Sequence, residues 1–155
     1  MTATQAWRRP VWPLVPRAGL AILYPMIETN ALSVEKLGPR IFLTTFIGKM
    51  SWDIATRAYE EFVPMVETMQ DPVWVSDATR LTGFDPTTLA LGARWFTAFK
   101  KRGGSYCLVA SQWERSIMAA RTMALGLGVR VRAYSSIAIA KDEAELILRD
   151  PERYR

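Results

Sequence analysis

Short apolar runs alternate with segments of helical periodicity along this chain, and this alternation restricts the fold more than any other feature. The apolar and β-branched runs predict five strands, at 31–37, 40–47, 73–77, 105–110 and 129–134. The segments between the later runs carry apolar residues every three or four positions, which predicts helices. Strands that alternate with helices favour a mostly parallel sheet with crossover helices.

Turn and capping residues indicate where these elements begin and end. Gly38-Pro39 separates the first two runs and predicts a hairpin. Three helices are expected to begin at capping side chains, namely Ser51, Asp85 and Ser111, the last in a capping box with Glu114. Pro64 is expected to kink or split the first helix, and a last helix is expected over 139–148. The order β-β-α-β-α-β-α-β-α predicts a single-domain α/β fold with a mixed, mostly parallel sheet.

The helix predicted from Asp85 to about Arg102 carries one main apolar face, formed by residues such as Phe96 and Phe99. Trp95 and Leu91 fall off that face by helical spacing. Because an exposed tryptophan is a typical interface anchor, Trp95 is a candidate contact for a partner protein.

Two residue types limit the chemistry open to this chain. The sequence has no histidine, which removes the most common general base and metal ligand and every Ser-His or Cys-His nucleophile pair. Its one cysteine, Cys107, lies in an apolar run and permits no intrachain disulfide, which fits a reducing compartment. No Walker-type or G-x-G-x-x-G string occurs. We therefore expect a cytoplasmic protein that is not an enzyme and holds no cofactor or metal.

Positive charge gathers at the two ends of the chain. The net charge is +5, yet residues 26–145 hold 14 basic and 13 acidic side chains. The one basic cluster in this body, Lys100 to Arg102, falls in the last turn of a predicted helix, where cations are favoured by the helix dipole. A nucleic-acid-binding domain carries a basic stripe of its own, so we expect no nucleic-acid partner.

Residues 1–25 form a segment rich in proline, tryptophan and arginine, followed by a predicted domain over 26–148 and a charged tail over 149–155. The segment is either an arm that packs on the domain, a docking segment, or a stretch that precedes a natural start at Met26. Its apolar run over 18–26 has nine residues, whereas a helix that spans a bilayer needs about 20. We therefore expect no stable membrane insertion.

Three stretches of sequence, in this order, carry a family resemblance. They are Val73 to Asp77 with Leu81 to Leu89, Arg102-Gly103-Gly104 leading into the strand 105–110, and Ser111 to Gly128 followed by a strand and Lys141 to Ala144. Together with the element order they resemble the STAS family of bacterial anti-sigma factor antagonists, the SpoIIAA-like proteins, over about residues 27–148. The resemblance implies their α/β fold and a regulatory protein partner, either kinase-like or anti-sigma-like.

The same resemblance locates a candidate regulatory site. In that family the serine directly after an aspartate is phosphorylated by a partner kinase, and here Pro86 follows Asp85. A switch of the family's kind would therefore use Thr87 or Thr88 as its phosphoacceptor. The competing explanation is that Asp-Pro-Thr-Thr is only a good helix start.

These observations leave three hypotheses of different classes. The first is a protein-binding regulatory module that contacts its partner, or another copy of itself, through the loop 77–88 and the following helix. Its candidate contact residues are Asp77, Asp85, Thr87, Thr88 and Trp95. The second is a carrier of a small apolar ligand or lipid, of the SpoIIAA-like or SEC14-like type, with a pocket behind the sheet. The third and weakest is an enzyme that uses Asp77 and Asp85.

Overall fold

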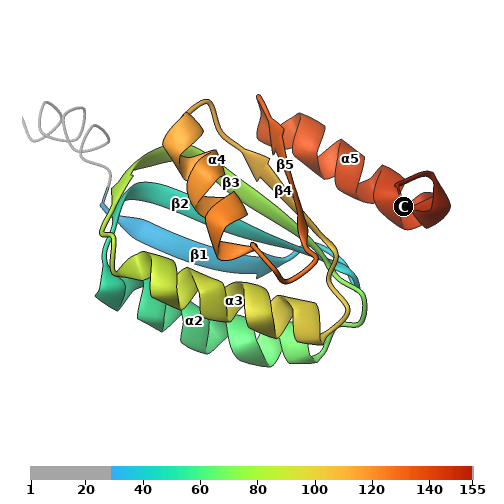
Figure 1. Cartoon of the computed structure of the whole chain (residues 1–155), viewed down its shortest axis with the longest axis horizontal. Coiled ribbons are helices and arrows are strands. Elements are labelled where there is room, and N and C mark those ends of the chain that lie inside the picture. Colours follow the sequence, from blue (N-terminus) through green and yellow to red (C-terminus); the bar gives the residue numbers. More distant parts are fainter. Residues whose placement is uncertain (1–28, 155) are drawn as a thin grey trace, which may run out of the picture.

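A single five-stranded sheet forms the centre of the computed structural model, which describes residues 29–154 (Figure 1). The predicted arm over 1–25 therefore lies outside the described residues. The strands are β1 (Ala31–Lys36), β2 (Ile41–Met50), β3 (Val73–Phe84), β4 (Tyr106–Ala110) and β5 (Arg130–Tyr134). They lie in the order β1-β2-β3-β4-β5, with β1 antiparallel to β2 and the other neighbours parallel. The prediction of a mixed, mostly parallel sheet is confirmed.

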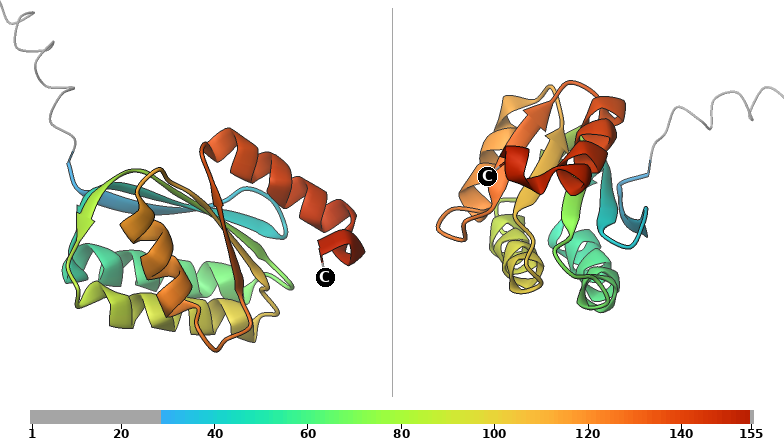
Figure 2. Two further views of the ribbon diagram at one scale, coloured as in Figure 1. Left: turned by 45° about the horizontal axis from the view of Figure 1, so that its top comes forward. Right: turned by 90° about the vertical axis from the view of Figure 1, so that its right-hand side faces the viewer.

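In the described part of the chain, four α-helices cover the two faces of the sheet unequally (Figure 2). They are α2 (Trp52–Glu67), α3 (Thr88–Lys101), α4 (Glu114–Met123) and α5 (Ile137–Arg149), and a short 3-10 turn η2 (Pro151–Tyr154) follows. Helices α2, α3 and α4 pack on one face, and α5 packs alone on the other. The element order in the described residues is the predicted one.

The face under the three helices holds an aromatic core. Its buried rings are Phe42, Phe62, Trp74, Trp95, Phe96 and Phe99. The ring of Trp95 stacks on that of Phe62 with centroids 4.5 Å apart, and its side chain is only 4% exposed. The prediction that Trp95 and Leu91 lie off the buried face is therefore wrong. Helix α3 contacts the sheet and both neighbouring helices, so its buried surface is wider than one stripe.

The helix boundaries test the predicted caps. Ser51 caps α2, since its Oγ accepts a hydrogen bond from the Ile54 amide at 3.4 Å, and the helix continues unbroken through Pro64. The predicted capping box at Ser111 is wrong. The helix begins only at Glu114, and the Ser111 hydroxyl accepts from the Trp113 amide at 3.0 Å and pairs with the Ser116 hydroxyl at 2.7 Å.

Candidate functional site

The ribbon formed by β2 and β3 extends beyond the rest of the sheet. Strand β4 ends at Ala110, opposite Asp77, whereas β3 continues to Phe84 and pairs with β2 as far as Met50. The predicted loop over 77–88 is therefore wrong for residues 77–84. The pair Thr82-Gly83 suggests a turn when taken alone, but the continuing partner strand imposes extended backbone, as tertiary pairing often overrides local preference.

Two bulges shape this ribbon, and each places one extra residue in β3 opposite β2. The register shifts between Thr45 and Ile47 and again between Gly48 and Lys49. Gly48 has φ +72°, and a Cβ atom there would lie 2.2 Å from Oδ1 of Asn30, which also accepts the Lys49 amide hydrogen at 2.9 Å. Only glycine fits both the left-handed backbone and this close approach. The two bulges increase the local twist of the ribbon before it reaches α3.

A tight turn connects β3 to α3. The Asp85 amide donates to the Met50 carbonyl at 2.9 Å, which ties the turn to β2. The Asp85 carboxylate accepts hydrogen bonds from the Thr87 amide at 3.2 Å and from the Thr87 hydroxyl at 3.0 Å. The helix begins only at Thr88, so the prediction that it starts at Asp85 is wrong. Asp85 stabilises the turn before the helix, because Asp side chains readily bond their own backbone two residues on.

The two candidate phosphoacceptors differ in access. Thr88 is 9% exposed, and its hydroxyl donates to the Asp85 carbonyl at 2.6 Å. Thr87 is exposed beside exposed Pro86. Thr87 also occupies the N-cap position of α3 without making a side-chain capping bond, and no acid lies in the first turn. Of the two, only Thr87 presents its side chain to solvent. We call residues 85–88 the α3 turn.

Asp77 lies apart from the α3 turn. Its carboxylate accepts hydrogen bonds from the Thr79 amide at 3.1 Å and the Thr79 hydroxyl at 2.6 Å. The eight residues from Asp77 to Phe84 belong to strand β3, and the seven steps between the first and the last cover about 23 Å at the usual rise. Within residues 29–154 no three acidic or cysteine side chains gather into a possible metal site. The structure therefore does not bring together the two aspartates that the sequence suggests as a pair.

A small apolar cavity lies beside the α3 turn, between the sheet and the helices α2, α3 and α4. Its volume is about 110 Å³. Its walls combine small residues with aromatic rings, namely Ala55, Ala78, Gly92, Ala119 and Ala120 with Trp74, Trp95 and Phe96. Thr88 and Leu89, in the first turn of α3, line it as well. The second hypothesis expects a pocket behind the sheet, and Trp74, Trp95 and Phe96 are among the aromatic residues that the sequence offers for its walls. The small wall residues come from separate elements, so no continuous stretch of sequence predicts them.

Close helix packing borders this cavity. A Cβ atom at Gly92 of α3 would lie 1.9 Å from Sδ of Met123 in α4. The missing side chain at Gly92 therefore leaves room for the flexible thioether of Met123, which also lines the cavity. Cys107 lines the cavity too, and full burial raises the pKa of its thiol far above the usual range. This thiol is therefore chemically inert in the folded state.

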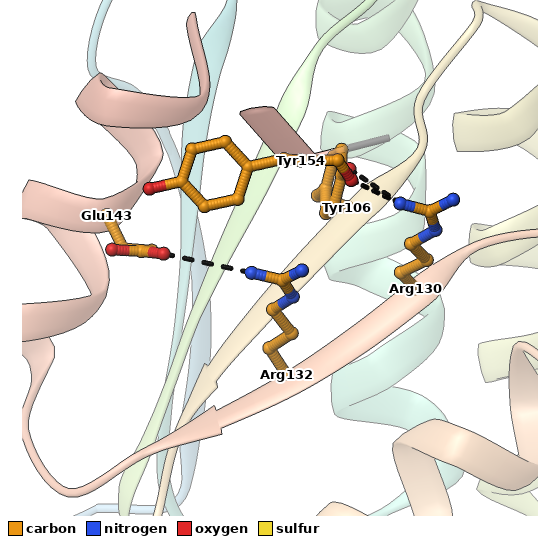
Figure 3. A network of polar contacts seen from close by, with 5 residues as sticks. All are labelled: Tyr106, Arg130, Arg132, Glu143 and Tyr154. Atoms are coloured by element: carbon orange, nitrogen blue, oxygen red, sulfur yellow. Dashed lines mark hydrogen bonds and ion pairs between the residues drawn. The ribbon is translucent and has the colours of Figure 1, made fainter. Parts of the chain in front are cut away.

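The opposite face of the sheet holds a polar network that closes the C-terminal end (Figure 3). The Tyr106 hydroxyl and the Arg130 guanidinium both donate to the backbone carbonyl of Tyr154. Arg132 lies over the rings of Tyr106 and Tyr154 and approaches Glu143 at 3.8 Å. Partial burial and the Glu143 carboxylate raise the pKa of Tyr134 nearby. These contacts fasten α5 and η2 to β4 and β5.

Comparisons with known proteins agree with the fold. No protein-family model matches the chain, and no curated protein matches it. Among solved structures it is similar to the anti-sigma factor antagonist SpoIIAA in its unphosphorylated form, with TM-score 0.56 and 12% identity over 74% of this chain and 98% of that one.

Two further structures give the same result. One is an uncharacterized protein from Shewanella loihica PV-4 with a SpoIIAA-like fold, with TM-score 0.53 and 13% identity over 76% of this chain and 98% of that one. The other is an anti-sigma factor antagonist from Mycobacterium paratuberculosis, with TM-score 0.53 and 14% identity over 76% of this chain and 95% of that one. The chain therefore has a SpoIIAA-like fold, which confirms the resemblance at the level of architecture.

Proposed function

We propose that this chain is a non-catalytic regulatory module that binds a partner protein through the α3 turn. The observation that carries the proposal is the exposed Thr87, whose backbone and hydroxyl are both held by the Asp85 carboxylate. A side chain fixed in this way loses little conformational freedom when a partner binds, which favours affinity. The fold shared with anti-sigma factor antagonists supports a regulatory role.

The chemistry of the α3 turn suits a switch by phosphorylation at Thr87. The first amides of α3 receive no side-chain capping bond from Thr87, and the positive end of the helix dipole lies there. A phosphate at a helix N-terminus is stabilised by such amides. The same phosphate would lie close to the Asp85 carboxylate, which now accepts the hydroxyl hydrogen, and this repulsion would open the turn. Phosphorylation would thereby change the surface that the partner contacts.

A photo-crosslinking experiment in cells of the source organism tests this proposal. A photoreactive amino acid at Thr87 is expected to trap a specific partner protein. The matched position is Gln70, which is exposed and lies in the connection before β3, at the other end of that strand. A protein trapped from Thr87 and not from Gln70 supports the proposal. Trapping at neither position, or equally at both, contradicts it.

A second candidate function, carriage of a small apolar ligand, is favoured by the cavity. A dry apolar cavity of about 150 Å³ binds a molecule the size of benzene. The cavity here is about 110 Å³, so it would hold a short alkyl chain or a small ring. Native mass spectrometry of the protein from its own host would then show a mass increment that is lost on denaturation.

Two leucine substitutions on the helices test this second candidate. Ala119→Leu fills the cavity and is expected to remove the increment. Ala90→Leu places the same side chain on the exposed side of α3 and is expected to keep it. An increment that survives Ala119→Leu contradicts carriage in this cavity.

Within the described residues every helix is too short or too polar to cross a bilayer. The cytoplasmic location stays a prediction.

A further inference from the structure

A surface groove runs between α2 and α3, away from the α3 turn and the cavity. Its volume is about 690 Å³. Its apolar part is formed by Tyr59, Val63 and Val66 of α2 and by Ala98 of α3. We call it the α2–α3 groove. It is the larger of the two concave features described for residues 29–154, and the proposed function does not use it.

The two walls of the α2–α3 groove carry opposite charges at the same spacing. The charged residues that line the groove are Glu67 on α2 and Arg94, Lys101 and Arg102 along and just after α3. Glu60 lies seven residues before Glu67 at the edge of the groove, and Arg94 and Lys101 are also seven residues apart. Seven residues are two helical turns, so both members of each pair lie on one side of their helix. All four side chains are exposed, and among the described residues none forms an ion pair. The groove thus has an acidic wall and a basic wall.

Helices α2 and α3 run side by side in the same direction, and their residues pair at a nearly constant offset in number. At one end the ring of Tyr59 lies 5.9 Å from that of Trp95, and at the other end Nε of Arg102 donates to the carbonyl of Met69 at 2.9 Å. Residue numbers on α2 and α3 therefore correspond with an offset of about 33 to 36. Glu60 consequently stands across the groove from Arg94, and Glu67 stands across from Lys101.

We propose that a second copy of this chain docks on the α2–α3 groove, with a two-fold axis that runs along the groove. A rotation by 180° about this axis leaves the direction of both helices and their position along the axis unchanged. It places the acidic wall of each copy opposite the basic wall of the other copy. The acidic wall then faces the partner subunit's Arg94 and the partner subunit's Lys101, and the basic wall faces the partner's acidic wall. The interface therefore holds four opposite-charge pairs around a shared apolar strip, as a self-complementary two-fold contact requires.

Charge complementarity selects this occupant. A uniformly acidic partner would be repelled by Glu60 and Glu67, and a uniformly basic partner would be repelled by Arg94 and Lys101. A second copy carries the opposite wall at the correct spacing on both sides. Because the charged side chains are exposed, the association is expected to be weak and to fall as salt screens them.

Sedimentation velocity of the full chain, from micromolar to sub-millimolar concentration, tests the proposal. The wild-type chain is expected to dimerise at low salt and to dissociate in high salt. Two charge-reversed variants, Glu60→Lys with Glu67→Lys and Arg94→Glu with Lys101→Glu, give two walls of the same sign. Each variant alone is expected to be monomeric, and an equimolar mixture of the two is expected to form a heterodimer.

The matched control is Arg115→Glu with Arg121→Glu, which makes the same change of charge as Arg94→Glu with Lys101→Glu, but on exposed positions of α4 outside the groove. This control is expected to dimerise like the wild type. Recovery in the mixture also excludes misfolding as the reason for monomeric variants. A wild-type chain that stays monomeric, variants that still dimerise alone, or a mixture that stays monomeric overturns the proposal. None of these outcomes bears on the α3 turn, which lies outside the groove.

Discussion

The two faces of the sheet are packed with different kinds of side chain. The face under α2, α3 and α4 is filled with large rings, and six aromatic side chains meet around Phe62 and Trp74. The face under α5 is filled with aliphatic strand residues, and Ala140 and Ala144 let the helix approach closely. Both alanines are completely buried. Large rings increase the distance between a helix and the sheet, whereas alanine side chains allow the helix backbone to pack close to it.

This difference accounts for where the candidate functional features lie. Rigid rings and small residues from four elements do not fill space completely, and the cavity of about 110 Å³ remains between them. The α3 turn and the α2–α3 groove belong to the same side of the molecule. The α5 face instead carries a polar network that fastens the end of the chain. The features proposed for binding therefore all lie on the three-helix side of the sheet.

The largest expected effect is on the aromatic core. Phe62 is fully buried and lies 4.5 Å from Trp95 and 5.4 Å from Phe42 between ring centroids. Phe62→Ala removes these contacts and leaves a cavity, so we expect the free energy of unfolding to fall by about 3–5 kcal/mol. Urea denaturation measures this change. A loss below about 1 kcal/mol would show that the ring cluster is not a tightly packed core.

A pair of leucine substitutions compares the faces directly. Ala144→Leu forces extra volume into the dense contact between α5 and the sheet, so we expect a loss of about 1–3 kcal/mol. Ala119→Leu enters existing space beside the cavity and is expected to cost much less. Thermal and urea unfolding of both variants provide the measurement. Equal losses would contradict the difference in packing between the two faces.

The buried thiol of Cys107 gives a pH-dependent prediction. Burial raises its pKa, so the thiol stays protonated in the folded chain when the unfolded chain has released its proton. Above about pH 8.5 the unfolded state binds fewer protons, and the free energy of unfolding falls by up to about 1.4 kcal/mol per pH unit. This stabilisation is fully present below the ordinary thiol pKa. Urea denaturation at several pH values, with Cys107→Ala as the reference, isolates the effect. An unchanged difference between the two proteins from pH 7 to 10 would refute it.

The smallest expected effect concerns the network on the α5 face. The pair between Arg132 and Glu143 spans 3.8 Å, and the arginine side chain is 39% exposed, so solvent screens the attraction. We expect Arg132→Gln to cost less than about 1 kcal/mol, with part of the loss from the stacking on Tyr106 and Tyr154. Glu143→Gln tests the ion pair without the stacking. Losses above about 2 kcal/mol would contradict the expectation that solvent screening keeps the contribution of this network small.

Local patterns predict the architecture better than the site. Alternating strands and helices, the Gly38-Pro39 hairpin and the Ser51 cap follow from short stretches of sequence, and all are confirmed. The extension of β3 to Phe84 depends on pairing with distant residues of β2, so the sequence alone suggests a loop there. Helical spacing alone leaves Trp95 off the main apolar face of α3. It takes no account of the neighbouring helix α2, whose Phe62 ring covers Trp95.

The α3 turn shows the same limit at the candidate site. Asp85 is recognised from sequence as a capping residue, but its carboxylate bonds Thr87 in a turn that precedes the helix. Only the three-dimensional arrangement separates exposed Thr87 from buried Thr88. The cavity combines side chains from seven elements and has no continuous sequence pattern.

Partner binding through the α3 turn is the central claim, and a native mass spectrum of the protein from its own host tests it most directly. The wild-type chain is compared with Asp85→Ala, which removes both hydrogen bonds to Thr87 while leaving the surface charge of the groove unchanged. We predict a complex with a second, different protein for the wild type and its loss in Asp85→Ala. A complex that persists in Asp85→Ala, or a wild-type chain without such a partner, would contradict the claim.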